Sequence, residues 1–439
     1  MTGCRIKLIC LISIAFFLIG SGLCHAEYDY IDITNPFLRK IPIAIPIFKN
    51  MSSGVTTEQL SIRASDLLAE TLAFTGYFKI LDRGAFLADP QTDAVFSDIN
   101  PQNWTSIGAE LLITGGVLIK DQMVEMELRL YDTFKEQLLV GKKYTGGIND
   151  QREMVRLFCS EAIYALTGDR GIFNSKIAFV STNSGNKEIY ICDFDGYKPK
   201  RFTHTESISL TPAWSSDGKW LAYTSYEKGK ADLYIKHLTE KFGAVIAKNG
   251  INITPAWIPG KFVLAATLSF SGDQEIYLLT GTGKISKRLT YNWGIDLSPT
   301  WSPDSKQMAF VSKRSGTPQI YIKNIDSGVV KRLTFQGNYN TQPTWSPKGD
   351  ILAYSAMEEG RSNIFVIGVD GEGPVQLTHN EGDNESPSWS PDGNLVVFSS
   401  TREGPSKVYV LTAYGTDQRR LLSMRGEQTD PEWSPRIVN

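Results

Sequence analysis

The sequence predicts a small α/β domain followed by an all-β, six-bladed β-propeller that the C-terminal strand closes. A chain of 439 residues is too long for one ordinary core, and its 41% hydrophobic and 21% charged content fits a folded globular protein. The second half is built from a repeat of 43 or 44 residues. Four short strands fill such a period in a propeller blade. The repeated tryptophans are Trp214, Trp257, Trp301, Trp345, Trp389 and Trp433.

The first 26 residues have the pattern of a secretory signal peptide. Arg5 and Lys7 precede an apolar run, and a stretch of small residues ends at Ala26. The apolar run is shorter than the ~20 residues that a membrane-spanning helix needs. We therefore predict cleavage after Ala26. The alternatives are a retained anchor and a lipid-modified Cys24, although the residue before Cys24 is not small.

Residues 27–168 lack the repeat and mix helical and strand patterns, which predicts the α/β domain. A strand over 41–48 is expected at a sheet edge, because its two prolines cannot donate to a ladder. Asp150 and Glu153 have the spacing of a capping box, and Gly168 is expected to end that helix. The other expected elements are a helix over 57–75 and strands over 77–81, 111–119, 123–131 and 137–144.

Each repeat of the propeller, predicted over 172–439, has the same internal order. A proline lies two residues before the tryptophan, and a turn of the Ser-Pro-Asp-Gly type usually follows it. These residue types suit tight turns, since proline presets φ and glycine supplies a positive φ. An alternating strand, an Ile-Tyr-like strand and a short fourth strand complete the unit. The alternating strands are expected over 176–181, 220–225, 262–267, 308–312, 351–355 and 395–399.

The order of these strands predicts how the ring closes. The strand over 176–181 comes before any tryptophan strand, and Trp433 comes after the last complete blade. We therefore expect residues 429–434 to supply the innermost strand of the first blade. Closure by both chain ends removes free sheet edges, which otherwise promote aggregation.

Charge and motifs narrow the function classes. The formal net charge is −2 and no dense Lys/Arg cluster occurs, which disfavours a nucleic-acid or anionic-membrane partner. No P-loop, HExxH, G-x-S-x-G or Cys/His metal spacing is present, so no cofactor or metal is expected. Cys159 and Cys192 are expected as packed, free thiols, and His204 and His379 as polar loop residues.

The mouth of the central channel is the candidate binding site. In a blade, the loops before the tryptophan strand and before the tyrosine strand share one face, and the former surround the channel. Apolar and small polar residues there suit a protein partner with a few anchors and a polar rim. The candidate contact residues are Thr211, Thr254, Asp296, Ser298, Thr341, Gln342, Glu385 and Asp430.

Residues 27–38 form a second candidate site. The segment mixes aromatic, apolar and acidic side chains, and Asn35-Pro36 interrupts any regular element. Such an arm suits addition to a sheet edge of a partner, and an edge strand of its own domain is the alternative. The candidate contact residues are Glu27, Tyr28, Asp29, Tyr30, Ile31, Asp32 and Ile33.

These features together resemble the TolB family of the Tol–Pal system. The resemblance rests on the combination of Ile43-Ala44-Ile45-Pro46 near the mature start, Gly171-Ile172-Phe173 before the first blade, and a chain that ends just after Pro-Glu-Trp433-Ser-Pro. It implies a periplasmic, non-enzymatic monomer that contacts membranes only through partners. It also implies binding of the lipoprotein Pal at the channel mouth, chiefly at Thr254 and Ser298, and of TolA through residues 27–38.

The role implied by the resemblance is to maintain the outer membrane and support envelope constriction in cell division. Two alternatives stay open. The 11% aromatic content also fits a propeller that binds carbohydrate or peptidoglycan. A propeller hydrolase is the other alternative, although too few residues follow the last repeat to form the hydrolase domain of prolyl-peptidase-like enzymes.

Overall fold

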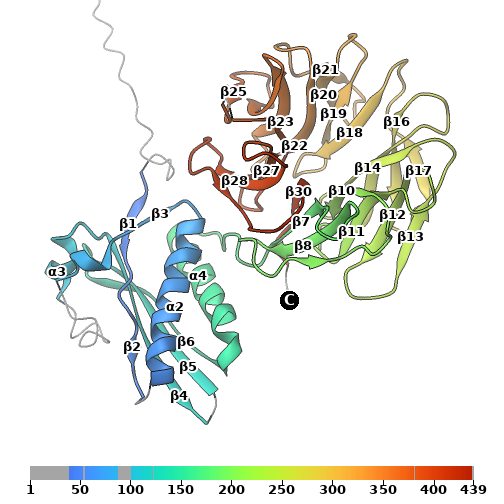
Figure 1. The fold of residues 1–439 in the computed structure, drawn as a ribbon. Coiled ribbons are helices and arrows are strands. Elements are labelled where there is room, and N and C mark those ends of the chain that lie inside the picture. The colour runs from blue at the N-terminus through green and yellow to red at the C-terminus, as the bar shows by residue number, and fades with distance from the viewer. Residues whose placement is uncertain (1–38, 53–54, 88–99, 122, 380, 438–439) are drawn as a thin grey trace, which may run out of the picture. The chain divides into compact units, whose positions relative to one another are not determined.

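The computed structural model describes residues 39–437 apart from 53–54, 88–99, 122 and 380 (Figure 1). Its first part contains a mixed sheet of order β3-β1-β4-β5-β6, with β2 paired to β4. Helices α2 and α4 pack against each other and against the sheet. The elements are β1 (Ile41–Ala44), β2 (Lys49–Asn50), α2 (Val55–Phe74), β3 (Phe78–Ile80), η1 (Arg83–Ala85), α3 (Pro101–Thr105), β4 (Leu111–Lys120), β5 (Met123–Asp132), β6 (Gln137–Gly147), η3 (Ile148–Asp150) and α4 (Gln151–Thr167).

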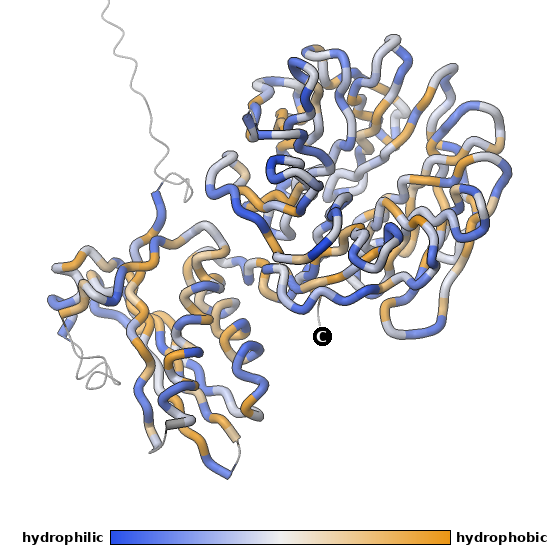
Figure 2. Tube along the Cα trace, in the orientation of Figure 1, coloured by the Kyte–Doolittle hydropathy of each residue, from blue (hydrophilic) through white to orange (hydrophobic). Residues whose placement is uncertain are grey.

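Helix α2 forms because its apolar residues share one face. Leu60, Ala64 and Leu68 are spaced by four residues and are almost completely buried. Figure 2 shows the same alternation of apolar and polar residues along both long helices. The short helix α3 was missed, although Asn100 caps it and Pro101 occupies its first turn, a combination typical of a helix start.

The expectation that the first strand lies at a sheet edge is wrong. β1 is an interior strand, paired in parallel with β3 on one side and β4 on the other. Pro42 is tolerated because the β1–β4 pairing begins only at Ile43 and Leu111, so no acceptor on β4 awaits the missing N–H. The carbonyl of Pro42 still accepts a hydrogen bond from Glu110 N at 2.9 Å.

The capping box predicted for α4 is also wrong. Asp150 makes no side-chain cap to α4, and its carboxylate instead accepts a hydrogen bond from Gly147 N at 2.8 Å. That bond belongs to the cap of the short helix η3, which directly precedes α4. The C-terminus follows the prediction, because Gly168 adopts φ 76° and donates to the carbonyl of Tyr164.

The second part is a propeller of six four-stranded antiparallel sheets. The observed second strands differ from the predicted ones by at most one residue, apart from β23, which extends to Glu358. From the inside outwards, the blades are β10 (Ser209–Trp214), β11 (Trp220–Ser225), β12 (Asp232–His237), β13 (Gly243–Ile246); β14 (Asn252–Trp257), β15 (Val263–Leu268), β16 (Glu275–Thr280), β17 (Ile285–Arg288); β18 (Asp296–Trp301), β19 (Gln307–Ser312), β20 (Gln319–Asn324), β21 (Val330–Arg332); β22 (Asn340–Trp345), β23 (Ile351–Glu358), β24 (Arg361–Gly368), β25 (Val375–Gln376); β26 (Asn384–Trp389), β27 (Leu395–Ser400), β28 (Lys407–Thr412), β29 (Arg419–Arg420); and β30 (Gln428–Trp433), β7 (Lys176–Ser181), β8 (Glu188–Asp193), β9 (Lys200–Arg201).

Ring closure by both ends of the propeller is confirmed. β30 is the innermost strand of the blade whose other strands are β7, β8 and β9. Its pairing with β7 joins residues more than 240 positions apart, from Gln428 opposite Ser181 to Trp433 opposite Ile177. The hydroxyl of Ser434 then accepts a hydrogen bond from Lys176 N at 2.8 Å.

The repeated tryptophans are packing elements, as predicted. All six are at most 7% exposed, and five of them, all but Trp433, belong to apolar clusters that join neighbouring blades. Four indole N–H groups donate to a carbonyl on the inner strand of the preceding blade, as Trp257 does to Ala213 at 3.2 Å. Each such indole therefore fills the core and fixes the spacing of two inner strands. Trp345 and Trp433 donate elsewhere, to Gly349 and Ser175.

Cys159 on α4 and Cys192 on β8 are both buried and free, as expected. Burial raises the pKa of both thiols, since it penalises the thiolate. Neither thiol is therefore poised as a nucleophile.

Candidate functional site

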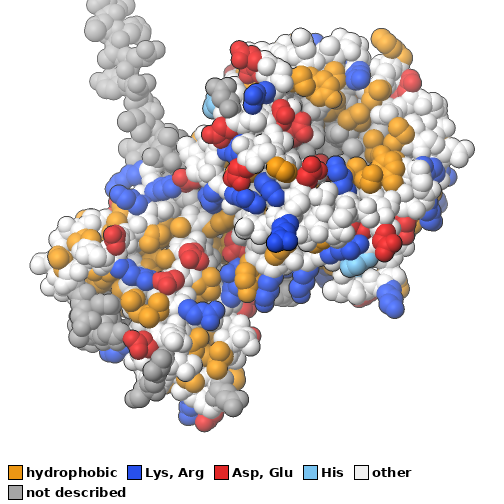
Figure 3. All heavy atoms as spheres, in the orientation of Figure 1, with side chains coloured by type: hydrophobic (Ala, Val, Ile, Leu, Met, Phe, Trp, Pro, Cys, Tyr) orange, Lys and Arg blue, Asp and Glu red, His pale blue; other side chains and the backbone are white. Residues whose placement is uncertain are grey.

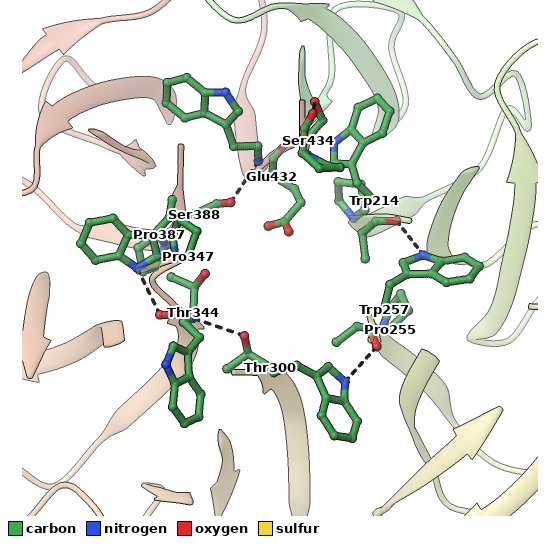
Figure 4. A pocket seen from close by; sticks show the side chains of 18 of the residues that line it. Trp214, Pro255, Trp257, Thr300, Thr344, Pro347, Pro387, Ser388, Glu432 and Ser434 are labelled. Atoms are coloured by element: carbon green, nitrogen blue, oxygen red, sulfur yellow. Dashed lines mark hydrogen bonds between the residues drawn. The ribbon is translucent and has the colours of Figure 1, made fainter. Parts of the chain in front are cut away.

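The propeller axis contains a cavity of about 590 Å³ that all six inner strands line. Figure 4 shows these strands arranged around the cavity, with their tryptophan rings directed outward into the blades. The lining comes from repeated positions: the third residue before each tryptophan, the proline and the residue after it, and several residues of the following turns. Because these positions repeat, any departure in one blade creates a local difference in the channel.

The two ends of the channel are formed by different connections of the blades. We call the end where the inner strands begin the loop face, and the end where they finish in Ser-Pro-Asp-Gly-type turns the turn face. The antiparallel pairing places the β11–β12, β15–β16 and β19–β20 connections on the loop face as well. The cavity extends from the third position before each tryptophan toward the turn face, where Pro303, Pro347 and Pro391 line it.

The six residues three positions before the tryptophans form a polar belt around the channel. Each has a φ between 47° and 55°. Each also lies at a register shift between the inner strand and the second strand of its blade. Left-handed backbone is costly for residues other than glycine, and such strain and bulges concentrate at functional sites. The belt consists of Thr211, Thr254, Ser298, Gln342, Ser386 and Asp430.

Hydrogen bonds connect this belt from blade to blade. The Gln342 side-chain amide donates to the Ser386 hydroxyl at 2.9 Å, and that hydroxyl lies 3.2 Å from the Asp430 carboxylate. On the other side of the ring, Thr254 Oγ1 accepts from Ser298 N at 3.3 Å and lies 2.8 Å from Thr267 Oγ1. These hydrogen bonds hold neighbouring members of the belt in place, and all six side chains are half-buried.

Two acids of β30 break the symmetry of the channel. Asp430 stands where the other inner strands have Thr, Ser or Gln, and Glu432 stands where they have Ala, Thr or Ser. Burial raises the pKa of Asp430, and hydrogen bonds from Ser386 and from the Thr211 N–H partly offset it. Burial also raises the pKa of Glu432, to about 7, against a hydrogen bond from Ser388. Figure 4 shows Glu432 pointing into the channel.

Replacing Glu432 with glutamine should stabilise the protein at alkaline pH. Because the folded protein holds this proton up to about pH 7 and an unfolded chain releases it near pH 4.5, the free energy of unfolding should fall as pH rises between these values. Because water in the channel reduces the effect of burial, we expect Glu432→Gln to raise the free energy of unfolding by about 2 kcal/mol at pH 8 and to leave it unchanged at pH 4. Urea unfolding at both pH values measures this, and identical pH profiles of the two proteins would contradict it.

The structure distributes the predicted mouth residues unequally. Thr211, Thr254, Ser298, Gln342 and Asp430 all line the cavity. The remaining three do not. Asp296 is fully buried and paired with Arg314 at 2.8 Å, Thr341 is half-buried, and Glu385 is exposed and accepts from the Ser362 hydroxyl at 3.0 Å.

The structure does not support Asp296 as a contact residue, because a completely buried, paired carboxylate offers nothing to a partner. Glu432 was missed, although comparing the residue before each tryptophan across the repeats would have identified it. The second candidate site, Glu27 to Ile33, lies outside the described residues.

The described residues contain no group of three or more His, Cys, Asp or Glu side chains placed to hold a metal ion. Within the same part of the chain, no helix is long and apolar enough to cross a membrane. His204 and His379 are both exposed, in connections of different blades.

The fold and the channel define a class of protein: a six-bladed propeller preceded by an α/β domain, with a polar belt inside the ring. Residues 163–437 match the family model of the TolB beta propeller domain, and residues 29–139 match that of the TolB amino-terminal domain. The chain belongs to the TolB family.

Relatives and a solved structure agree with this assignment. The chain is 57% identical to the "Tol-Pal system protein TolB" of Desulfosudis oleivorans over an alignment of 285 residues, which covers 65% of each chain. It is 44% identical over 252 residues to the "Protein TolB homolog" of Chlorobaculum tepidum, which covers 57% of each. The alignments thus span less than two thirds of these relatives. The crystal structure of TolB from Acinetobacter baumannii matches with a TM-score of 0.78 at 28% identity, over 90% of this chain and 97% of that one.

Proposed function

We propose that this protein is a periplasmic, non-enzymatic binding component of the Tol–Pal system. It binds Pal at the loop-face mouth of the propeller channel and TolA through residues 27–38. By connecting these partners it supports outer-membrane integrity and envelope constriction during division. It is a monomer, needs no cofactor, and meets membranes only through its partners.

The polar belt is the observation that carries the proposal. It sets six half-buried side chains around the channel, one from each blade and each on strained backbone, and hydrogen bonds link several neighbours. Small polar groups held rigidly in this way can accept a partner without reorganising, which lowers the cost of association. Membership of the TolB family, whose curated relatives are named as Tol–Pal system proteins, supports the choice of partner system.

Deleting residues 27–38 from the mature protein should separate the two binding activities. We expect TolA binding to be lost and Pal binding to stay within about twofold, because the belt lies wholly within the propeller. Isothermal titration calorimetry with the periplasmic part of each partner measures both. An unchanged melting temperature is the control, since an edge strand of the α/β domain would destabilise that domain when removed.

Loss of both activities in the deletion variant would contradict the two-site proposal. Binding of the wild-type protein to isolated cell-wall sacculi without Pal would instead favour the carbohydrate-binding alternative.

A further inference from the structure

Two neighbouring connections on the loop face depart from the repeat in the same way. Residues 289–295 join β17 to β18, and residues 333–339 join β21 to β22, so they enter and leave the blade β18–β21. Neither contains a charged residue, whereas the equivalent connections over 202–208, 377–383 and 421–427 each contain at least one acid. A symmetric ring therefore has one chemically distinct sector.

This sector exposes aromatic side chains to an unusual degree. Tyr291 is 71% exposed, Trp293 77%, Phe335 71% and Tyr339 47%. Each connection begins with a buried Leu-Thr pair, which fixes the backbone so that the following Tyr291 or Phe335 faces outward. Apolar side chains gather over β14 to β21 in Figure 3. Four exposed aromatics on two neighbouring connections are more than the single exposed apolar residues usual on a surface, and such concentrations mark interaction sites.

An arginine in the same sector lacks the partner that its equivalents have. Arg288 donates to the buried Glu275 at 2.7 Å, and Arg201 to Glu188 at 2.8 Å in another blade. In the blade of Arg332, the position of Glu275 and Glu188, the first residue of the third strand, is occupied by the neutral Gln319. Arg332 donates to the Thr334 carbonyl and stacks over Phe335 at 4.9 Å, and no ion pair to it is found among the described residues.

We propose that Tyr291, Trp293, Phe335, Tyr339 and Arg332, here called the aromatic sector, anchor the protein partner that docks on the loop face. The sector fits a partner surface that presents a carboxylate beside apolar side chains, because a positive guanidinium stacked on an exposed ring attracts both. Tryptophan, tyrosine and arginine are also the residues that dominate interface energetics.

This inference rests on the proposed function and deepens it. The loop face is the face proposed for Pal, and the belt residue Ser298, the third residue of β18, follows Trp293 by only five positions. The aromatic sector is thus continuous with the proposed channel-mouth contact. It supplies the apolar anchors that the belt, made of small polar groups and one carboxylate, does not.

The test measures the affinity of lipid-free Pal for the full mature protein and its variants. We expect Trp293→Ala and Phe335→Ala each to weaken binding by roughly tenfold or more. Arg332→Gln, which copies Gln376 at the matching position of the next blade, should weaken binding several-fold and reduce its dependence on salt. Phe242→Ala is the matched control: it is 65% exposed, lies on the turn face between β12 and β13, and should bind as wild type.

Other outcomes identify where the idea fails. Wild-type affinity in Trp293→Ala and Phe335→Ala, while an arginine in the belt abolishes binding, would overturn the aromatic sector and leave the proposed function standing. No binding of Pal to the wild-type protein would overturn both. Unchanged Pal binding with loss of sacculus binding would make the occupant a glycan. A wild-type dimer that these substitutions convert to a monomer would make it a second copy of this chain.

Discussion

Removing residues 429–439 is expected to abolish cooperative folding of the propeller. The deletion takes away nearly all of β30, so β7 loses its inner neighbour and its edge is left unpaired inside the ring. It also removes the buried Trp433 and the Glu432 carbonyl that accepts from the Trp214 indole. Loss of one buried tryptophan alone costs about 3–5 kcal/mol, against a typical total stability of about 5–15 kcal/mol.

Thermal unfolding followed by circular dichroism measures this effect. The control is a chain that ends at Ile437, which keeps the Ser434 and Ile437 hydrogen bonds to the start of the propeller. Removing the last two residues of a chain usually costs little stability, so the control should melt as the full chain does. A deletion variant that melts within a degree or two of the full chain would show that the ring is not held by its last strand.

The sequence predicted the propeller closely because its signals are local and repeated six times. A turn of the Ser-Pro-Asp-Gly type indicates where the second strand of a blade begins, and a strand boundary that is ambiguous in one repeat can be inferred from the others. The α/β domain has no such repetition. There the proline rule gave the wrong place for β1, because a missing N–H matters only where a neighbouring strand offers an acceptor.

The belt itself could be located from the sequence, but its conformation could not. Six residues with no common side chain adopt a positive φ, and each precedes a proline, a context that usually favours extended backbone. The bulge is set by the pairing with the second strand, which joins Ile253 to Thr267 and Ala256 to Ala265 and leaves two residues between them unpaired. Such a register shift depends on the assembled sheet rather than on the residue that it strains.

For Asp296, the strand position could be predicted from the sequence, but the burial of its side chain could not. Its position at the start of an inner strand suggested an acidic group at the channel mouth, yet it is buried and its pKa is raised by that burial, against the opposing effect of Arg314. The partner comes from the β19–β20 connection, which the repeat pattern did not associate with it. A contact residue could therefore be told from a structural one only once both connections had been placed.

A long charged side chain at the channel mouth should interfere strongly with Pal binding. Replacing Thr254 with arginine should weaken Pal binding by about a hundredfold or more, as expected where a long charged side chain enters the centre of an interface. Thr254 is half-buried in the belt and faces the cavity, so its replacement must extend into the lumen. Ser298→Arg should have the same effect, because Ser298 occupies the equivalent position in the next blade.

The fold should tolerate Thr254→Arg. The substitution loses hydrogen bonds to Thr267 and Ser298, each worth about 1 kcal/mol, but an unbranched side chain is less strained than threonine at φ 48°. Thr282→Arg is the matched control, since Thr282 is exposed in the β16–β17 turn on the turn face. Calorimetry with lipid-free Pal and a melting curve for each variant measure the two effects separately. If Thr282→Arg weakened binding and Thr254→Arg did not, Pal would dock on the turn face, and the polar belt would serve only to hold the six inner strands together.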